Sequence, residues 1–475
     1  MKGGFSMNEV FGRKYKDHLV IGVAPTKRGF LSMEEAVRQK EKFMAVIRGV
    51  KSDIVTIVDI DDICENGIMY RYEEVAQVAE KFRLAGIDAL FTPFCDFGEE
   101  QTVATLAARL NVPTLVWGPR DERPNTDESR GRDTQCGMFA ATKVMRRYGV
   151  RYSYIFNCET DHPMFEQGYT NFLRVVNALK TVHGLRIAKF GSRPLPFISV
   201  TGNEGDLMTK FGITTVPVSL TDVKQDADAI EAENGEFYQA YTADIMKRMD
   251  CSAMAEDKVR RVAAITMAAK KQMLEKDCTV GAMECWPATS LFGVAVCTTL
   301  GELSDDGFPL SCENDINGAV TMALLRAISL GEGSVFLADL TIRDPENDNA
   351  ELLWHCGPFP YSLKDAGCQA RLVGGQERFI MKKGALTLCR FDDADNKFYL
   401  FAGEGRGIDG PETNGTYVYL ETDDWKRWEE KLIFGPYIHH IGGLYGEYFP
   451  VLREVARYLE VEFDHVNADG PYSLS

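Results

Sequence analysis

Residues 18–60 read HLVIGVAPTKRGFLSMEEAVRQKEKFMAVIRGVKSDIVTIVDI, and the fold class can be predicted from this stretch. The apolar run at 18–24 predicts a buried strand, and a second apolar run begins at Asp53. Between them, Ser32 is followed three residues later by Glu35, which is the pattern of a helix N-terminus. Two buried strands joined by an amphipathic helix predict a parallel β-α-β unit.

The same alternation continues towards the C-terminus. Helical patterns and apolar runs take turns up to residue 157, with helices expected at 72–86, 99–110 and 138–149 and strands at 87–94, 113–118 and 152–157. Strand, helix and strand follow one another again between 186 and 218. A chain of this length is expected to divide into two or three domains. We therefore expect two doubly wound α/β domains, at residues 1–175 and 176–350.

The last quarter of the chain has a different pattern. Segments 385–392, 397–405 and 415–423 alternate apolar and polar residues and are separated by turn-forming residues. Period-two alternation of this kind is typical of antiparallel strands. The sequence thus predicts a β-rich C-terminal domain at 351–475, with an amphipathic helix at 447–463.

Composition excludes several classes of partner. The chain has 475 residues and a formal net charge of −17, which argues against nucleic acid and anionic membranes. It has no run of 18 uncharged apolar residues and no secretory pattern at its start. The twelve cysteines are scattered without a CxxC pair, so reduced thiols in a cytoplasmic protein are expected.

The first predicted strand leads into a loop with Gly22 and Gly29, but the spacing is not GxGxxG. A GxxxxGK[ST] stretch is also missing. These are the backbone patterns that cradle the phosphates of NAD and ATP. The sequence therefore predicts no nucleotide cofactor, and it disfavours a nicotinamide-dependent oxidoreductase.

Carboxylates and histidines gather in a few segments of the second half. GAMECWPATS places Glu284 beside Trp286, and LSCENDINGAV places Glu313, Asn314 and Asp315 before a helix-like run. Only seven histidines exist, of which two are adjacent, and the segments LLWHCG and PYIHHIGG supply His355, His439 and His440.

A divalent metal that works on oxygen chemistry needs carboxylates, imidazole and open positions for substrate. Glu284, Asp315 and His440 supply that set if folding brings them together. Residues of these types also have ordinary structural roles. Acids ahead of a helix often cap it, while His355 and Trp286 each fit a protein core as well as a site.

These segments resemble the L-fucose isomerase / L-arabinose isomerase family. CENDINGAV at 312–320 and the histidine pair are the most specific parts of the resemblance. ECWPA around Glu284, WHCG around His355, and the stretches 118–137 and 191–213 also look like members of the family.

The resemblance implies a Mn²⁺-dependent interconversion of an aldose and its ketose, through proton transfer in an ene-diol. It implies two α/β domains, a β-rich C-terminal domain, and trimers or hexamers with sites near subunit interfaces. Carried over by position, Glu284 and Asp315 would be the acid–base pair and would bind Mn²⁺ or another divalent metal, with His440 as the third ligand. The remaining residues near the sugar would be His439, Trp286, His355 and Asn314.

Two other functions stay open at this point. One is isomerisation of an unusual anionic sugar, phosphorylated or sulfonated, with five arginines as candidate anion contacts: Arg120, Arg123, Arg130, Arg132 and Arg193. Long polar loops are usually solvated, so these arginines also fit a surface role. The other function is that of a non-catalytic sugar-binding protein built from two α/β lobes.

Overall fold

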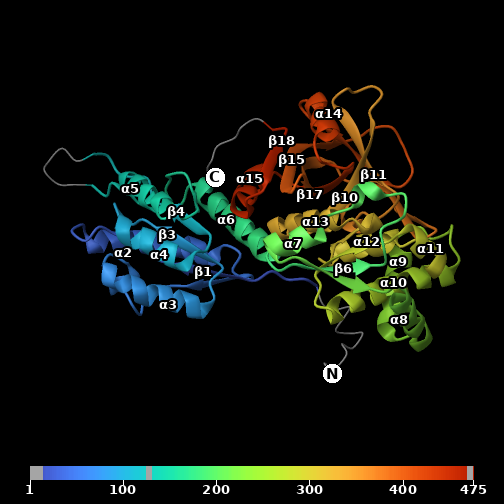
Figure 1. Cartoon of the computed structure of the whole chain (residues 1–475), viewed down its shortest axis with the longest axis horizontal. Helices are drawn as coiled ribbons and strands as arrows, with labels where there is room; N and C mark the ends of the chain where they lie inside the picture. The colour runs from blue at the N-terminus through green and yellow to red at the C-terminus, as the bar shows by residue number, and fades with distance from the viewer. Residues whose placement is uncertain (1–13, 125–130, 468–473, 475) are drawn as a thin grey trace. The chain divides into compact units, whose positions relative to one another are not determined.

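The computed structural model describes residues 14–124, 131–467 and 474 (Figure 1). The chain forms two compact units. The N-terminal unit contains residues 17–180 with the segment 453–458, and the C-terminal unit contains 181–452 with 459–467. Division into three domains at residues 175 and 350 stays a prediction.

The N-terminal unit is built on a parallel five-stranded sheet with the order β2-β1-β3-β4-β5. Ser32 accepts a hydrogen bond from the backbone N–H of Glu35 at 3.2 Å, as the sequence predicts for the start of the first helix. The α/β prediction is confirmed for this unit. Its elements are β1 Leu19–Val23, α2 Met33–Gly49, β2 Val55–Val58, α3 Val75–Ala85, β3 Ala89–Pro93, α4 Glu100–Leu110, β4 Thr114–Trp117, α5 Thr134–Arg147, β5 Tyr152–Tyr154 and α6 Pro163–Val182.

The C-terminal unit begins with a second parallel sheet, which has four strands in the described residues and the order β7-β6-β8-β9. Parallel strands end at the same edge of a sheet, so the residues after β6, β8 and β9 lie near one another. The elements are β6 Arg186–Phe190, α7 Glu204–Phe211, β7 Thr214–Val218, α8 Leu220–Glu233, α9 Glu236–Arg248, α10 Glu256–Glu275, β8 Val280–Met283, α11 Trp286–Phe292, α12 Cys297–Asp305, β9 Leu310–Ser311, the 3₁₀ turn η4 Cys312–Asn314 and α13 Ile316–Ser329.

The rest of this unit is rich in β-strands, as predicted. Among the described strands, β16, β11, β10, β17, β14 and β15 pair antiparallel in that order, and β15 pairs again with β16, so the ring closes into a barrel. Closure leaves those strands without free edges. The strands are β10 Phe336–Arg343, β11 Ala350–His355, β14 Gly384–Ala394, β15 Lys397–Ile408, β16 Thr416–Glu421 and β17 His440–Tyr445. Outside the ring lie β12 Arg371–Val373, β13 Gln376–Ile380, α14 Trp425–Phe434 and β18 Glu462–His465. Helix α15 Phe449–Leu459 contains the segment 453–458 that belongs to the N-terminal unit.

Helix α13 forms the centre of the C-terminal unit. All of its residues are buried, and it packs on β8 of the parallel sheet and on β14 and β17 of the barrel. Gly442 permits this close approach, because a Cβ there would lie 2.6 Å from the Thr321 side chain. The helix therefore joins the two sheets beside the first residues of β17, where the histidine pair lies.

Within the described part of the chain, the helices are too short or too polar to cross a bilayer.

Candidate metal centre

Strand pairing in the barrel brings acids and histidines together. In the register of β10 with β17, Asp339 lies opposite His440. On its other side β10 pairs with β11, where Asp339 lies opposite Trp354 and next to His355 at the strand end. Glu313 reaches the same place from η4, which follows β9 of the parallel sheet.

The ligand atoms of these side chains converge. His440 Nε2 lies 3.0 Å from Glu313 Oε2 and 3.5 Å from Asp339 Oδ1. His355 Nε2 lies 4.0 Å from Asp339 Oδ1, and His439 Nε2 lies 3.9 Å from the same oxygen. Asp339, His439 and His440 form one of the groups of described residues whose ligand atoms could share a metal ion.

Four of these atoms are buried and have no hydrogen-bond partner among the described residues: Glu313 Oε2, Asp339 Oδ1, His355 Nε2 and His440 Nε2. Buried polar atoms are nearly always paired, because desolvating them without compensation costs about 1–3 kcal/mol each. Carboxylate oxygens and imidazole nitrogens are donor types that a hard divalent cation takes. The residues present thus fit a metal ion.

The orientation of His440 is fixed from behind. Its Nδ1 lies 2.9 Å from Asp315 Oδ2, so Nε2 faces Glu313 and Asp339. The carboxylate of Asp315 also accepts from the backbone N–H of Gly318 at 2.8 Å and from Arg390 Nη2 at 3.1 Å.

The charges in this group are tightly coupled. Burial favours the neutral acid, but the Arg390 guanidinium and the His440 ring hold the pKa of Asp315 well below its usual range. Burial likewise opposes charge on His440, while its contacts with Asp315 and Glu313 raise the pKa of the imidazole to about 9. A metal at Nε2 would displace a proton there.

The structure places the sequence-predicted residues in different surroundings. His439 and His440 form a ligand group with Asp339, and His355 Nε2 lies 4.0 Å from the same carboxylate. Neither group of possible ligands found in the described residues includes His355, Glu284 or Asp315. Glu284 follows β8 and accepts a hydrogen bond from the backbone N–H of Ser192 at 2.8 Å. Asp315 caps α13 and contacts His440 through the ring nitrogen that faces away from the cluster.

The other expected substrate residues divide between surface and interior. Trp286 is 51% exposed at the start of α11, whereas Asn314 is buried and donates to the Phe190 carbonyl at 3.0 Å. Of the candidate anion contacts, Arg132 is bound to Glu122 at 2.8 Å and Arg193 is half-buried in the loop after β6. Arg130 lies outside the described residues.

Asp339 and Phe197 were not predicted from the sequence. Phe197 stacks on the His440 ring, with centroids 5.7 Å apart and planes 15° apart. It also meets Trp286 at 5.7 Å and His439 at 5.8 Å, edge to face. The only signal for Asp339 in the sequence is its place as the one acid within the apolar run SVFLADL. An acid buried in a strand needs a partner.

Comparison with known proteins finds similar sugar isomerases. Residues 22–185 match the family described as fucose/sulfoquinovose isomerase, N-terminal domain. Similar proteins include a sulfoquinovose isomerase of Priestia aryabhattai, 24% identical over 92% of this chain and 97% of the relative. Others with that name come from Alkalicoccus urumqiensis, 28% identical over 70% of this chain and 75% of the relative, and from Clostridium sp. (strain MSTE9), 25% identical over 77% and 83%.

The fold, the donor cluster and these matches define the chain as an enzyme of the aldose–ketose isomerase class. These matches support the fucose isomerase-like family that its motifs predicted.

Proposed function

We propose that this enzyme interconverts a sulfonated aldose and its ketose at a divalent-metal site formed by Glu313, Asp339 and His440. The four buried donor atoms that make no hydrogen bond among the described residues carry the metal part of the proposal. The relatives named sulfoquinovose isomerase support the substrate class.

Two carboxylates and one or two imidazoles suit Mn²⁺ or a similar hard cation. His355 supplies a fourth donor beside Asp339. When bound, such a cation supplies Lewis acidity that polarises a carbonyl and stabilises negative charge on neighbouring oxygens.

Isomerisation of an aldose moves a proton between two adjacent carbons and another between their oxygens. Both transfers need groups that accept and return protons within hydrogen-bond reach. Glu313 and Asp339 are the carboxylates that face the cluster, so we place the acid–base role on them in preference to Glu284 and Asp315. Asp315 then orients His440 through Nδ1, and Arg390 keeps Asp315 ionised.

Phe197, Trp286 and His439 form an aromatic wall beside the donors. A sugar ring has apolar C–H faces that pack on aromatic rings, and excluding water strengthens the electrostatic interactions within the site. We propose that the wall binds the sugar and that Arg193, in the same loop as Phe197, contacts the sulfonate.

A substrate panel tests this function. Metal-free protein is loaded with Mn²⁺ and assayed for aldose–ketose conversion with sulfoquinovose, glucose 6-phosphate and L-fucose. We expect the highest kcat/KM with the sulfonated sugar and no turnover after chelation. Equal kcat/KM for the neutral and sulfonated sugars would refute the substrate assignment.

A further inference from the structure

Two buried thiols lie beside the proposed catalytic carboxylate. Strands β8 and β9 are parallel neighbours, with Gly281 opposite Leu310. The chain leaves both at the same edge of the sheet, so Cys285 at the start of α11 meets Cys312 at the start of η4.

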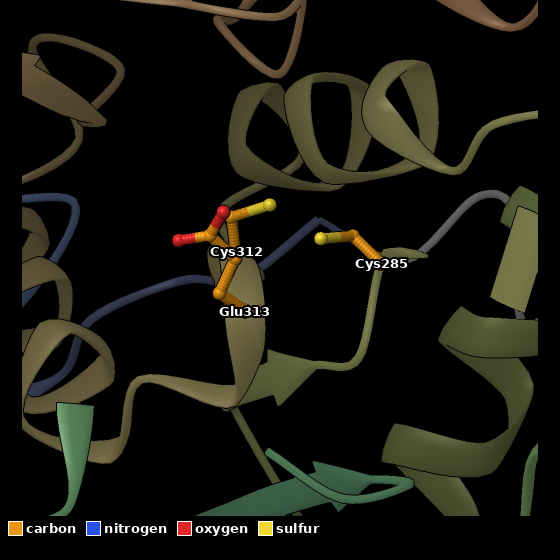
Figure 2. A group of neighbouring side chains, drawn as sticks. All are labelled: Cys285, Cys312 and Glu313. Atoms are coloured by element: carbon orange, nitrogen blue, oxygen red, sulfur yellow. The ribbon is translucent and has the colours of Figure 1, made fainter. Parts of the chain in front are cut away.

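The three side chains Cys285, Cys312 and Glu313 form a compact donor set (Figure 2). The two thiols and one carboxylate oxygen all lie within 4.8 Å of one another. Figure 2 shows the two sulfur atoms extending towards each other from their two segments, with the Glu313 carboxylate beside Cys312. The exposed fractions of Cys285, Cys312 and Glu313 are 5%, 1% and 6%.

The backbone is strained where this set forms. Glu313 and Asn314 have φ of 59° and 58°, a region that side chains other than glycine seldom adopt. Such strain costs about 1–3 kcal/mol per residue and persists where the surroundings enforce it. Here the Glu313 carboxylate lies within 4.8 Å of both thiols, and its buried Oε2 lies 3.0 Å from His440 Nε2.

We propose that Cys285, Cys312 and Glu313 bind a thiophilic divalent cation, of the class of Zn²⁺ or Cd²⁺, at a site that shares only Glu313 with the hard-metal centre. Thiolate sulfur with one carboxylate oxygen is a donor set for zinc and not for Mn²⁺. Metal–sulfur bonds of about 2.3 Å and metal–oxygen bonds of about 2.0–2.2 Å would draw these donors closer together than the 4.8 Å within which they lie. Binding releases the two thiol protons to solvent, and the fourth position is left for water.

The site would act on catalysis through Glu313. This consequence rests on the proposed function, in which Glu313 binds the hard metal and transfers protons. A cation held by both thiols draws on the same carboxylate, so Zn²⁺ or Cd²⁺ inhibits the enzyme and Mn²⁺ weakens their binding.

Cadmium-113 NMR on the full chain tests the site itself, because the shift separates sulfur-bound from oxygen- and nitrogen-bound cadmium. The chain is titrated with ¹¹³Cd²⁺ while excess Mg²⁺ competes for hard sites. We expect a resonance of mixed sulfur–oxygen coordination in the wild type that is lost in Cys285→Ser and in Cys312→Ser. Only oxygen–nitrogen resonances, or a resonance that survives in both variants, would overturn the proposal.

Cys278→Ser is the matched control. Its thiol is also buried in the same unit, donates to the Lys276 carbonyl at 3.5 Å, and belongs to neither ligand group of the described residues. It should keep the sulfur-bound resonance. Circular dichroism of each variant separates loss of the site from loss of the fold. If Glu313→Gln kept the resonance and bound Cd²⁺ with unchanged affinity, the carboxylate would not be a ligand of the site.

Inhibition is measured separately with Mn²⁺-loaded enzyme. Cd²⁺ should inhibit the wild type and the Cys278→Ser control, while Cys312→Ser needs at least about tenfold more Cd²⁺. An inactive wild type with an intact sulfur-bound resonance would count against the proposed function alone, whereas equal inhibition of the active Cys312→Ser variant would refute the thiol site.

Discussion

Asp315→Asn separates a residue that orients a metal ligand from one that binds the metal. The Asp315 carboxylate contacts His440 Nδ1 at 2.9 Å, Gly318 N at 2.8 Å and Arg390 Nη2 at 3.1 Å, all in the interior. The amide keeps the size of the side chain but removes the charge that holds the imidazole.

Asp315→Asn has two expected costs, one in metal affinity and one in folding stability. Removing a partner that holds a metal-ligating histidine costs 10–100-fold in metal affinity, or about 1.4–2.7 kcal/mol. Removing one of the two carboxylates that pair with the buried Arg390 guanidinium costs up to about 3–5 kcal/mol of folding stability. Asp315→Asn should therefore weaken Mn²⁺ binding and lower the urea midpoint together.

Asp392→Asn is the matched control. Asp392 binds the other side of the same guanidinium, with its Oδ2 2.9 Å from Arg390 Nε. Among the described residues, it makes no hydrogen bond or ion pair with His440. It should lower the free energy of unfolding while Mn²⁺ affinity changes by less than about threefold.

Mn²⁺ affinity is measured by electron paramagnetic resonance of free Mn²⁺, and stability by urea unfolding. Wild-type affinity in folded Asp315→Asn would refute the orienting role. Equal weakening in both variants would show that affinity follows stability and not the contact with Nδ1.

Four further outcomes are expected. Glu313→Gln and Asp339→Asn should each reduce kcat by about 10²–10⁴-fold with folding retained, as measured by steady-state turnover and circular dichroism; near-normal kcat in either would remove it from the acid–base pair. Phe197→Ala should raise KM about tenfold more than it changes kcat, because one aromatic contact is worth about 0.5–1.5 kcal/mol. Burial, with Glu429 nearby, raises the pKa of Glu351 to about 7. As pH rises, Glu351 therefore ionises in the unfolded state first, and the free energy of unfolding of the wild type falls between about pH 4.5 and 7. In urea unfolding, Glu351→Gln should match the wild type at pH 4 and be more stable than it above pH 7, by up to about 3 kcal/mol. Chelation should abolish turnover and Mn²⁺ should restore it, as measured with sulfoquinovose.

Local pattern was enough to predict most of the fold. Apolar runs separated by amphipathic helices specify parallel strands, and period-two alternation at 385–392 and 397–405 specifies the hairpin of β14 and β15. Closure of the barrel was not predicted, because the second pairing of β15 with β16 depends on the curvature of the whole sheet.

The site was harder to predict, for a physical reason. Rare residues such as the His439–His440 pair are visible in a sequence, but Asp339 becomes notable only through its register with His440. Glu313 and Asp315 lie two residues apart in one motif, and only the backbone decides which carboxylate faces the cluster. The left-handed φ of Glu313 and the capping role of Asp315 turn them to different neighbours.

Anomalous diffraction at the manganese absorption edge, from crystals grown with Mn²⁺, tests the metal centre most directly. We predict a single strong peak bounded by Glu313, Asp339 and His440, with Asp315 still bound to Nδ1 on the far side of the ring. A peak coordinated by Glu284 or by Asp315, or no peak in an active crystal, would contradict the proposed centre.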